Sequence, residues 1–147
     1  MKTVSEILEK KGRTIWSISP DATVYEALQL MAEKEIGAVL VTENGELVGI
    51  MSERDYARKI VLKGKFSKET KVREIMSSKV IYVNPSLNAE ECMVLMINKR
   101  VRHLPVFSGH KLIGVISIGD VVNAVIDEQE FVIDQLVHYI KGIPALE

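Results

Sequence analysis

The sequence contains two near-copies of one 42-residue segment. Residues 14–55 align with residues 79–120 without a gap, and ten of the 42 pairs are identical. Just upstream, residues 4–8 (Val-Ser-Glu-Ile-Leu) match residues 72–76 (Val-Arg-Glu-Ile-Met) after a further shift of three residues. Self-similarity of this kind marks a tandem duplication, so the fold must be one that two copies of the same unit can build together. The identical pairs are Pro20/Pro85, Glu26/Glu91, Leu30/Leu95, Met31/Met96, Lys34/Lys99, Val41/Val106, Leu47/Leu112, Gly49/Gly114, Ser52/Ser117 and Asp55/Asp120.

Each copy begins with a predicted strand and a predicted helix. The strands, Ile15–Ile18 and Val80–Val83, lead to a proline that stops strand pairing. The helices carry apolar residues at i, i+3, i+4 and i+7, and Thr23 and Asn88 are suitable N-caps. Their apolar positions are Val24, Ala27, Leu28 and Met31 in the first copy and Ala89, Cys92, Met93 and Met96 in the second.

A predicted hairpin and a second helix complete each copy. The hairpin strands are Ala38–Thr42 and Leu47–Met51 in the first copy, where Asn44-Gly45 is a strong turn signal. In the second copy they are Leu104–Phe107 and Leu112–Ile116. The closing helices start at Ser52 and Ser117.

These elements predict an α+β fold, with two small sheets flanked by helices and a pseudo-two-fold axis between the copies. One copy alone is too short to bury a stable core, so we expect the two copies to pack sheet to sheet around one shared core. The predicted divisions are repeat 1 at 1–62, a linker at 63–71, repeat 2 at 72–127, and a C-terminal helix and tail at 128–147. The extra helix, Glu128–Lys141, should cover the module or pack on a second chain through Val132, Ile133, Leu136, Val137 and Ile140.

Composition narrows the classes of function. The net charge of −1 gives no general attraction to nucleic acid or to an anionic membrane. No stretch is apolar enough for a membrane span, and no signal or transit peptide is visible, so we expect a cytoplasmic protein. A single cysteine, Cys92, fits a reducing compartment and a core position. No glycine-rich phosphate loop, metal-binding motif or nucleophile–base pair indicates an enzyme, and no cofactor is expected.

The order of elements, each copy ending in Gly-h-h-Ser-x-x-Asp where h is aliphatic, resembles the CBS domain first described in cystathionine β-synthase. Residues 49–55 (Gly-Ile-Met-Ser-Glu-Arg-Asp) and 114–120 (Gly-Val-Ile-Ser-Ile-Gly-Asp) both fit, as does the Val-Arg-His-Leu-Pro-Val segment at 101–106. The chain is most similar to stand-alone bacterial and plant-organellar CBS pairs. The resemblance implies a regulatory module that binds AMP, ADP, ATP, NAD(H) or S-adenosylmethionine, forms a homodimer and modulates a partner protein. The plant relatives imply a redox partner of the thioredoxin kind.

The Ser-x-x-Asp pairs suit a nucleotide. An ionised carboxylate such as that of Asp55 or Asp120 accepts hydrogen bonds from both hydroxyls of a ribose. Ser52 and Ser117 open helices, where free N–H groups favour a phosphate. The same pattern also describes a plain capping box, in which serine and acid cap their own helix. The sequence leaves both interpretations open.

The cations differ between the copies. Arg102 and His103 lie where the family contributes phosphate contacts, and the first copy has Gly37 and Ala38 in those columns. Conversely, Arg54 and Arg58 of the first copy align with Gly119 and Asn123, although a solvated helix face would also explain them. Two non-equivalent clefts are therefore expected.

The adenine is expected to lie against aliphatic walls, by analogy with the family. Taken singly, each of these residues is also an ordinary core position. They are Thr14, Ile15, Ile18, Ile36 and Ala38 in one half, Val80, Val83 and Val101 in the other, with Met51 and Ile116 closing the walls. Two functions follow: a sensor of adenine nucleotides, or an interaction scaffold whose clefts bind nothing.

Overall fold

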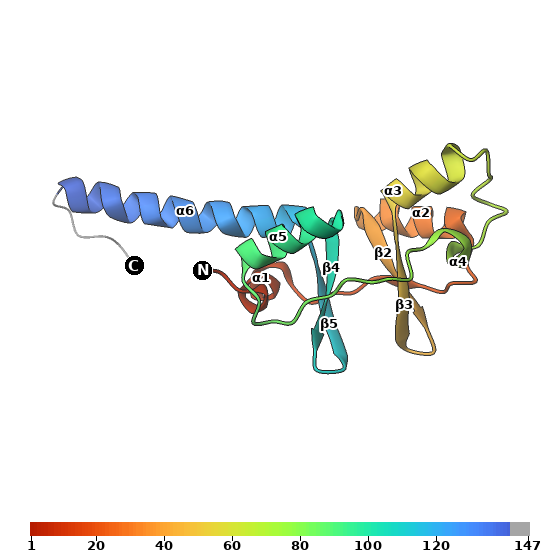
Figure 1. Cartoon of the computed structure of the whole chain (residues 1–147), viewed down its shortest axis with the longest axis horizontal. Coiled ribbons are helices and arrows are strands. Elements are labelled where there is room, and N and C mark those ends of the chain that lie inside the picture. Colours follow the sequence, from red (N-terminus) through yellow and green to blue (C-terminus); the bar gives the residue numbers. More distant parts are fainter. Residues whose placement is uncertain (142–147) are drawn as a thin grey trace. The chain divides into compact units, whose positions relative to one another are not determined.

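The computed structural model describes residues 1–141, so the tail expected at 142–147 lies outside the described residues. The chain forms two compact units (Figure 1). Unit 1 combines Met1–Thr14 with the chain from Ile81 onward, and unit 2 is Ile15–Val80. Each unit therefore contains the strands of one repeat and the short helix that precedes the other repeat in the sequence.

Unit 2 contains a three-stranded sheet in the order β1-β2-β3. Strand β1 runs parallel to β2, and β2 and β3 form the predicted antiparallel hairpin. Asn44 and Gly45 have φ values of 54° and 79°, as a turn between such strands requires. The elements are β1 (Ser17–Ile18), α2 (Val24–Lys34), β2 (Ala38–Glu43), β3 (Glu46–Ser52), α3 (Glu53–Tyr56), the π-helical segment η1 (Ala57–Val61) and α4 (Val72–Ile75).

Unit 1 repeats this plan with a two-stranded sheet, β4-β5. The predicted N-caps are confirmed in both units, since the side chains of Thr23 and Asn88 accept hydrogen bonds from the third residue of their helices. The elements of unit 1 are α1 (Val4–Lys11), α5 (Ala89–Lys99), β4 (His103–Ser108), β5 (Lys111–Ser117) and α6 (Ile118–Lys141).

The first strand of each copy is shorter than predicted. The expected strand Ile15–Ile18 reduces to β1, and Val80–Val83 reduces to a single bridge between Val83 and Val106. In unit 2 the N–H of Leu40 donates to the carbonyl of Trp16. The aligned residue in unit 1 is Pro105, which has no N–H to donate, and this accounts for the weaker pairing there.

The glycine of each Gly-h-h-Ser-x-x-Asp motif leaves space for a segment that packs closely on the last strand. A Cβ at Gly114 would lie 2.8 Å from Leu8 of α1, and a Cβ at Gly49 would lie 2.7 Å from the sulfur of Met76, just after α4. Leu8 and Met76 are matched positions of the upstream repeat. Helices α1 and α4 therefore play the same part in units 1 and 2.

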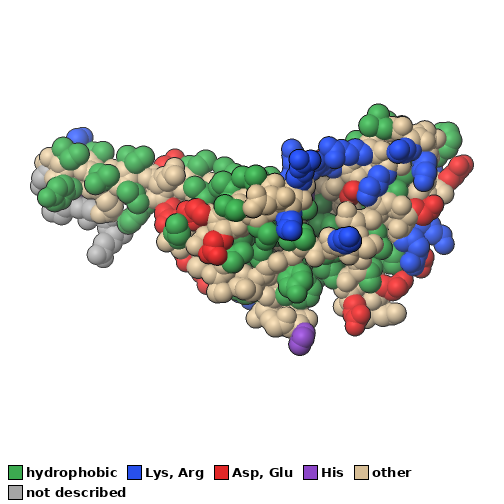
Figure 2. Space-filling model, in the orientation of Figure 1, with side chains coloured by type: hydrophobic (Ala, Val, Ile, Leu, Met, Phe, Trp, Pro, Cys, Tyr) green, Lys and Arg blue, Asp and Glu red, His purple; other side chains and the backbone are tan. Residues whose placement is uncertain are grey.

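Helix α6 corrects the prediction of a separate C-terminal helix. The closing helix of repeat 2 and the segment 128–141 form one continuous helix of 24 residues. Figure 2 shows hydrophobic side chains along the part of α6 that extends to the left of the view. The predicted apolar stripe does not cover the module, because Val132, Ile133, Leu136, Val137 and Ile140 are all exposed.

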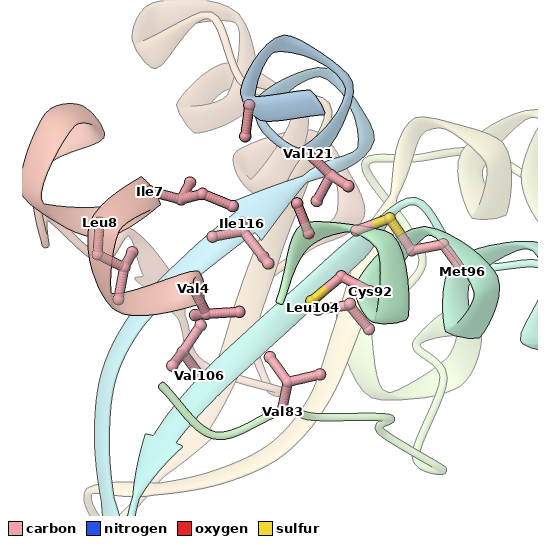
Figure 3. Close-up of a cluster of buried hydrophobic side chains, with 12 residues drawn as sticks. Val4, Ile7, Leu8, Val83, Cys92, Met96, Leu104, Val106, Ile116 and Val121 are labelled. Carbon is pink, nitrogen blue, oxygen red and sulfur yellow. The ribbon is translucent and has the colours of Figure 1, made fainter. Parts of the chain in front are cut away.

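Most of the buried hydrophobic residues form two clusters, one within each unit, and the expected packing of the two copies around one shared core stays a prediction. In unit 1 the cluster lies between β4, β5 and the helices α1, α5 and α6 (Figure 3). Cys92 is buried within it, as predicted, and burial raises the pKa of its thiol to about 11. This cysteine is therefore a core residue with little thiolate at neutral pH.

Candidate functional site

The first Ser-x-x-Asp motif lies where β3 passes into α3. The N–H of Ser52 donates to Asp55 Oδ2 at 2.9 Å, and the N–H of Asp55 donates to Ser52 Oγ at 3.2 Å. The two residues thus form a capping box, which confirms that interpretation of the motif. The N–H of Glu53 donates to the carbonyl of Gly37, so the start of α3 is also tied to the entry of β2.

A lysine holds the other oxygen of this carboxylate. Lys59 Nζ lies 3.0 Å from Asp55 Oδ1 and donates to the carbonyl of Ile75 at 2.7 Å. Lys59 therefore links the motif to the end of α4. Asp55 keeps 15% of its side chain exposed, so it is neither buried in the core nor fully solvated.

The second motif, at the junction of β5 and α6, has the same cap. The N–H of Ser117 donates to Asp120 Oδ2 at 2.7 Å, and the N–H of Asp120 donates to Ser117 Oγ at 3.2 Å. Here the lysine comes from α1: Lys11 Nζ donates to Asp120 Oδ2 at 2.6 Å and to the carbonyl of Val115 at 2.8 Å. All of these bonds to the carboxylate use one oxygen, Oδ2.

The electrostatics around Asp120 keep it ionised. Burial raises the pKa of Asp120, but the hydrogen bonds from Lys11 and Ser117 outweigh burial and leave the pKa below its ordinary value. The pKa of His103 is lowered, first by burial and then by the charges of Lys11 and Arg102, against the opposing charge of Asp120. At neutral pH the site thus presents a carboxylate beside a neutral imidazole.

The structure brings the predicted cations of the second copy to this motif. His103 opens β4 and pairs with Ser117 of β5. The carbonyl of Arg102 accepts a hydrogen bond from the N–H of Ile118, the first residue of α6, and the Arg102 side chain is exposed. In unit 2, Arg54 lies within α3 and is half-buried, whereas Arg58 lies in η1 and is exposed.

Of the ten predicted wall residues, three are buried, six are half-buried and Thr14 is exposed. Met51, Val83 and Ile116 belong to the two hydrophobic cores, and the side chains of Met51 and Ile116 have no exposed surface to offer a ligand. Thr14 falls in unit 1 and Val80 in unit 2, the reverse of their assignment by repeat. The half-buried wall residues are Ile15, Ile18, Ile36, Ala38, Val80 and Val101.

Lys11 and Lys59 are the site residues that the sequence interpretation missed. Lys59 follows Asp55 by four residues, a spacing that brings side chains together on a helix, so the pair was visible in the sequence. Lys11 had no such signal. It contacts Asp120 only because α1 packs on β5 and α6, 109 residues away along the chain.

Among residues 1–141, no group of three or more His, Cys, Asp or Glu side chains is arranged to hold a metal ion. No described helix is long and apolar enough to cross a membrane.

Comparison with known proteins identifies the family. The family model of the CBS domain matches twice, at residues 4–62 and 72–127. These two matches span most of the chain and coincide with the two copies of the repeat. The chain belongs to the CBS-domain family and is a tandem CBS pair.

Relatives from plants and bacteria share this arrangement. The chain is 41% identical to the CBS domain-containing protein CBSX3, mitochondrial, of Arabidopsis thaliana over 95% of its own length and 72% of that protein. A putative signal-transduction protein with CBS domains from Burkholderia ambifaria is 53% identical, with a TM-score of 0.84 over 87% of this chain and 96% of that one. The structure of CBSX2 in complex with AMP is 26% identical, with a TM-score of 0.69 over 88% of this chain and 99% of that one.

Proposed function

We propose that this chain is a regulatory module that binds an adenine nucleotide, AMP, ADP, ATP or NAD(H), at its Ser-x-x-Asp motifs. The carboxylates of Asp55 and Asp120 accept the ribose hydroxyls, and the nucleotide state is passed to a partner protein. The module acts as a homodimer and carries out no catalysis itself. The AMP bound to the related CBSX2 supports an adenine nucleotide as the class of ligand.

The observation that carries the proposal is the state of the Asp120 carboxylate. It is ionised, half-buried and fixed at the first turn of α6 by Ser117 and Lys11. The N–H of Ser117 and Lys11 Nζ both donate to Oδ2. A carboxylate has about four acceptor sites on its two oxygens, so capping the helix and binding a diol are compatible.

The groups around this carboxylate suit a phosphate. Arg102 provides an exposed guanidinium next to the start of β4, and neutral His103 provides a ring that donates one hydrogen bond. In unit 2 the corresponding charges come from Arg54 and Arg58. The half-buried aliphatic residues of each unit, among them Ile18, Ile36 and Val101, provide apolar surface for a purine.

Nucleotide binding by the full chain tests the proposal. Calorimetry with AMP, ATP, NADH and S-adenosylmethionine should detect at least one ligand, and that ligand should raise the melting temperature. Asp120→Asn keeps an acceptor for the cap but removes the charge, so we expect affinity for the ligand of this motif to fall at least about tenfold. The 2′-deoxy form of the ligand should bind the wild type correspondingly weakly.

A matched control separates ribose binding from general charge. Asp21→Asn removes a carboxylate that pairs with Arg73 on the surface of unit 2, and it should leave nucleotide affinity unchanged. The ribose role fails if the Asp55→Asn/Asp120→Asn double variant binds like the wild type. If none of the four ligands binds, the interaction scaffold would instead be favoured.

A further inference from the structure

Helix α6 leaves the rest of unit 1 after Glu128. Its first part is fixed, because Val121 and Ala124 are buried. The chain's amino terminus lies 3.0 Å from Glu128, and Lys10 lies 3.0 Å from Asp127. From residue 129 to residue 141 none of the side chains is buried, and the helix continues for more than three turns.

This projecting part carries an aliphatic stripe. Ile133, Leu136, Val137 and Ile140 follow the i, i+3, i+4, i+7 spacing of one helix face, and they are 60%, 55%, 39% and 80% exposed. A stripe of four branched aliphatic side chains in water is an unfavourable surface, and its burial would be the main driving force for association with another molecule.

We propose that this stripe binds the same stripe of a second copy of the chain, helix against helix and antiparallel. The spacing between the four residues is three, one and three, which reads the same in both directions along the helix. A two-fold axis between Leu136 and Val137 therefore sets Ile133 beside the partner's Ile140 and Leu136 beside the partner's Val137. Because the contact is isologous, each stripe residue is buried in both copies, and every contact between two stripe residues occurs twice.

The charges of α6 favour the antiparallel direction. Glu130 and Asp134 lie one turn apart on one flank of the stripe, and Lys141, seven residues after Asp134, lies on the same flank. In the antiparallel register the partner's Lys141 is level with Val132, about 3 Å along the axis from both acids. In a parallel pair with equal register, the two-fold axis runs along the helices and places this flank of the two copies on opposite sides of the contact, so Lys141 would not meet the two acids.

The same charges argue against a membrane as the occupant. Segment 127–141 has four acidic residues and one lysine. Helices that lie on anionic membranes carry lysine and arginine on their polar face, so this helix would be repelled. The inference specifies the surface of the homodimer proposed above and does not depend on nucleotide binding.

The oligomeric state of the full chain tests the proposal. We expect sedimentation equilibrium to give the mass of a dimer for the wild type. Leu136→Glu places a charge in the middle of the contact in both copies, so the dissociation constant should rise at least about tenfold and the monomer should predominate. Phe131→Glu is the matched control: Phe131 is 59% exposed on the same helix but lies about 140° around it from Leu136. This control should remain a dimer.

Cross-linking tests the direction. A mixture of Ile133→Cys and Ile140→Cys chains should form a disulfide-linked pair under mild oxidation, whereas Ile133→Cys alone should not. The native Cys92 will not interfere, because it is buried and its pKa is about 11. Lys141→Glu should weaken the dimer, and adding Glu130→Lys should restore it.

Four results would overturn the proposal: a monomeric wild type, a Leu136→Glu chain that is still dimeric, efficient linking of Ile133→Cys to itself, or no rescue in the charge-swapped chain. The thermal shift with nucleotide is measured on the same variants. A Leu136→Glu chain that is monomeric but still binds nucleotide separates this contact from the proposed ligand site. A wild type that is dimeric but binds no nucleotide would refute only the ligand site.

Discussion

The two Ser-x-x-Asp motifs have the same backbone and different cations. In both units the first N–H of the closing helix donates to the residue before the hairpin, Glu53 to Gly37 and Ile118 to Arg102, and the aspartate caps its own helix. The lysines that hold the aspartates differ. Lys59 belongs to the closing helical segment of unit 2, whereas Lys11 comes from α1.

The two copies share the aspartate and its cap, but they do not share the position of the lysine. The carboxylate and its cap occur in equal positions of the two copies, but Lys59 aligns with Ala124, and Lys11 lies before the aligned segments 14–55 and 79–120. Each motif aspartate is nevertheless held by a lysine that also donates to a backbone carbonyl. The copies therefore reach one local arrangement by two routes, and only the motif of unit 1 depends on the amino-terminal helix.

Substitution of the glycine three residues before each motif serine should show the largest difference between the two units. Gly49→Ala would bring a Cβ within 2.9 Å of the backbone carbonyl of Ser77, which exchanges hydrogen bonds with Ile50. We expect the free energy of unfolding to fall by about 2–3 kcal/mol, since backbone cannot move aside cheaply. Gly114→Ala meets only the end of the Leu8 side chain and should cost less, about 1–2 kcal/mol.

Urea unfolding of the two variants measures the two losses in the free energy of unfolding. Gly119→Ala is the control, because its Cβ would meet only Ser117 Oγ at an ordinary 3.6 Å and it lies in a helix. This control should not be destabilised. Equal losses for Gly49→Ala and Gly114→Ala would mean that Leu8 is as rigid as the backbone around Ser77.

The lysines provide a second, smaller test. Lys11→Met removes the hydrogen bonds to Asp120 and Val115, so the pKa of Asp120 should rise and unfolding at pH 7 should become about 1 kcal/mol easier. A carboxyl with a lowered pKa stabilises the fold above its ordinary pKa and loses that contribution as the pH falls through the folded value. The acid-dependent loss of stability below about pH 4 should therefore shrink in this variant.

Carbon NMR of the carboxyl groups and urea unfolding at several pH values check this. Lys59→Met is the matched control, since it removes an equivalent lysine from the other unit and should leave the pKa of Asp120 unchanged. An Asp120 pKa that is the same in Lys11→Met and in the wild type would show that the cap alone keeps the carboxylate ionised.

Local patterns predicted the elements of each copy, and long-range packing decided the rest. The caps at Thr23 and Asn88, the hairpin turn at Asn44-Gly45 and the buried Cys92 all follow from short-range rules and were confirmed. The sequence did not reveal that α1 and α4 pack beside the strands of the other repeat, because such packing leaves no periodic signal. The contact of Lys11 with Asp120 was missed for that reason.

The smallest effect is expected from a substitution that gives the second copy the residue of the first. His103 aligns with Ala38, so His103→Ala removes the imidazole whose pKa is affected by the charges of Lys11, Asp120 and Arg102. Burial, Lys11 and Arg102 lower the pKa of His103 in the fold. The unfolded chain therefore binds more protons than the folded chain between the two pKa values, and stability falls as the pH drops from about 6.5 toward the folded value.

That loss should disappear in His103→Ala, whereas His110→Ala, in the exposed turn between β4 and β5, should keep it. Unfolding free energies at pH 8 and pH 5 measure the difference, and an unchanged pH dependence in His103→Ala would mean that another group causes it.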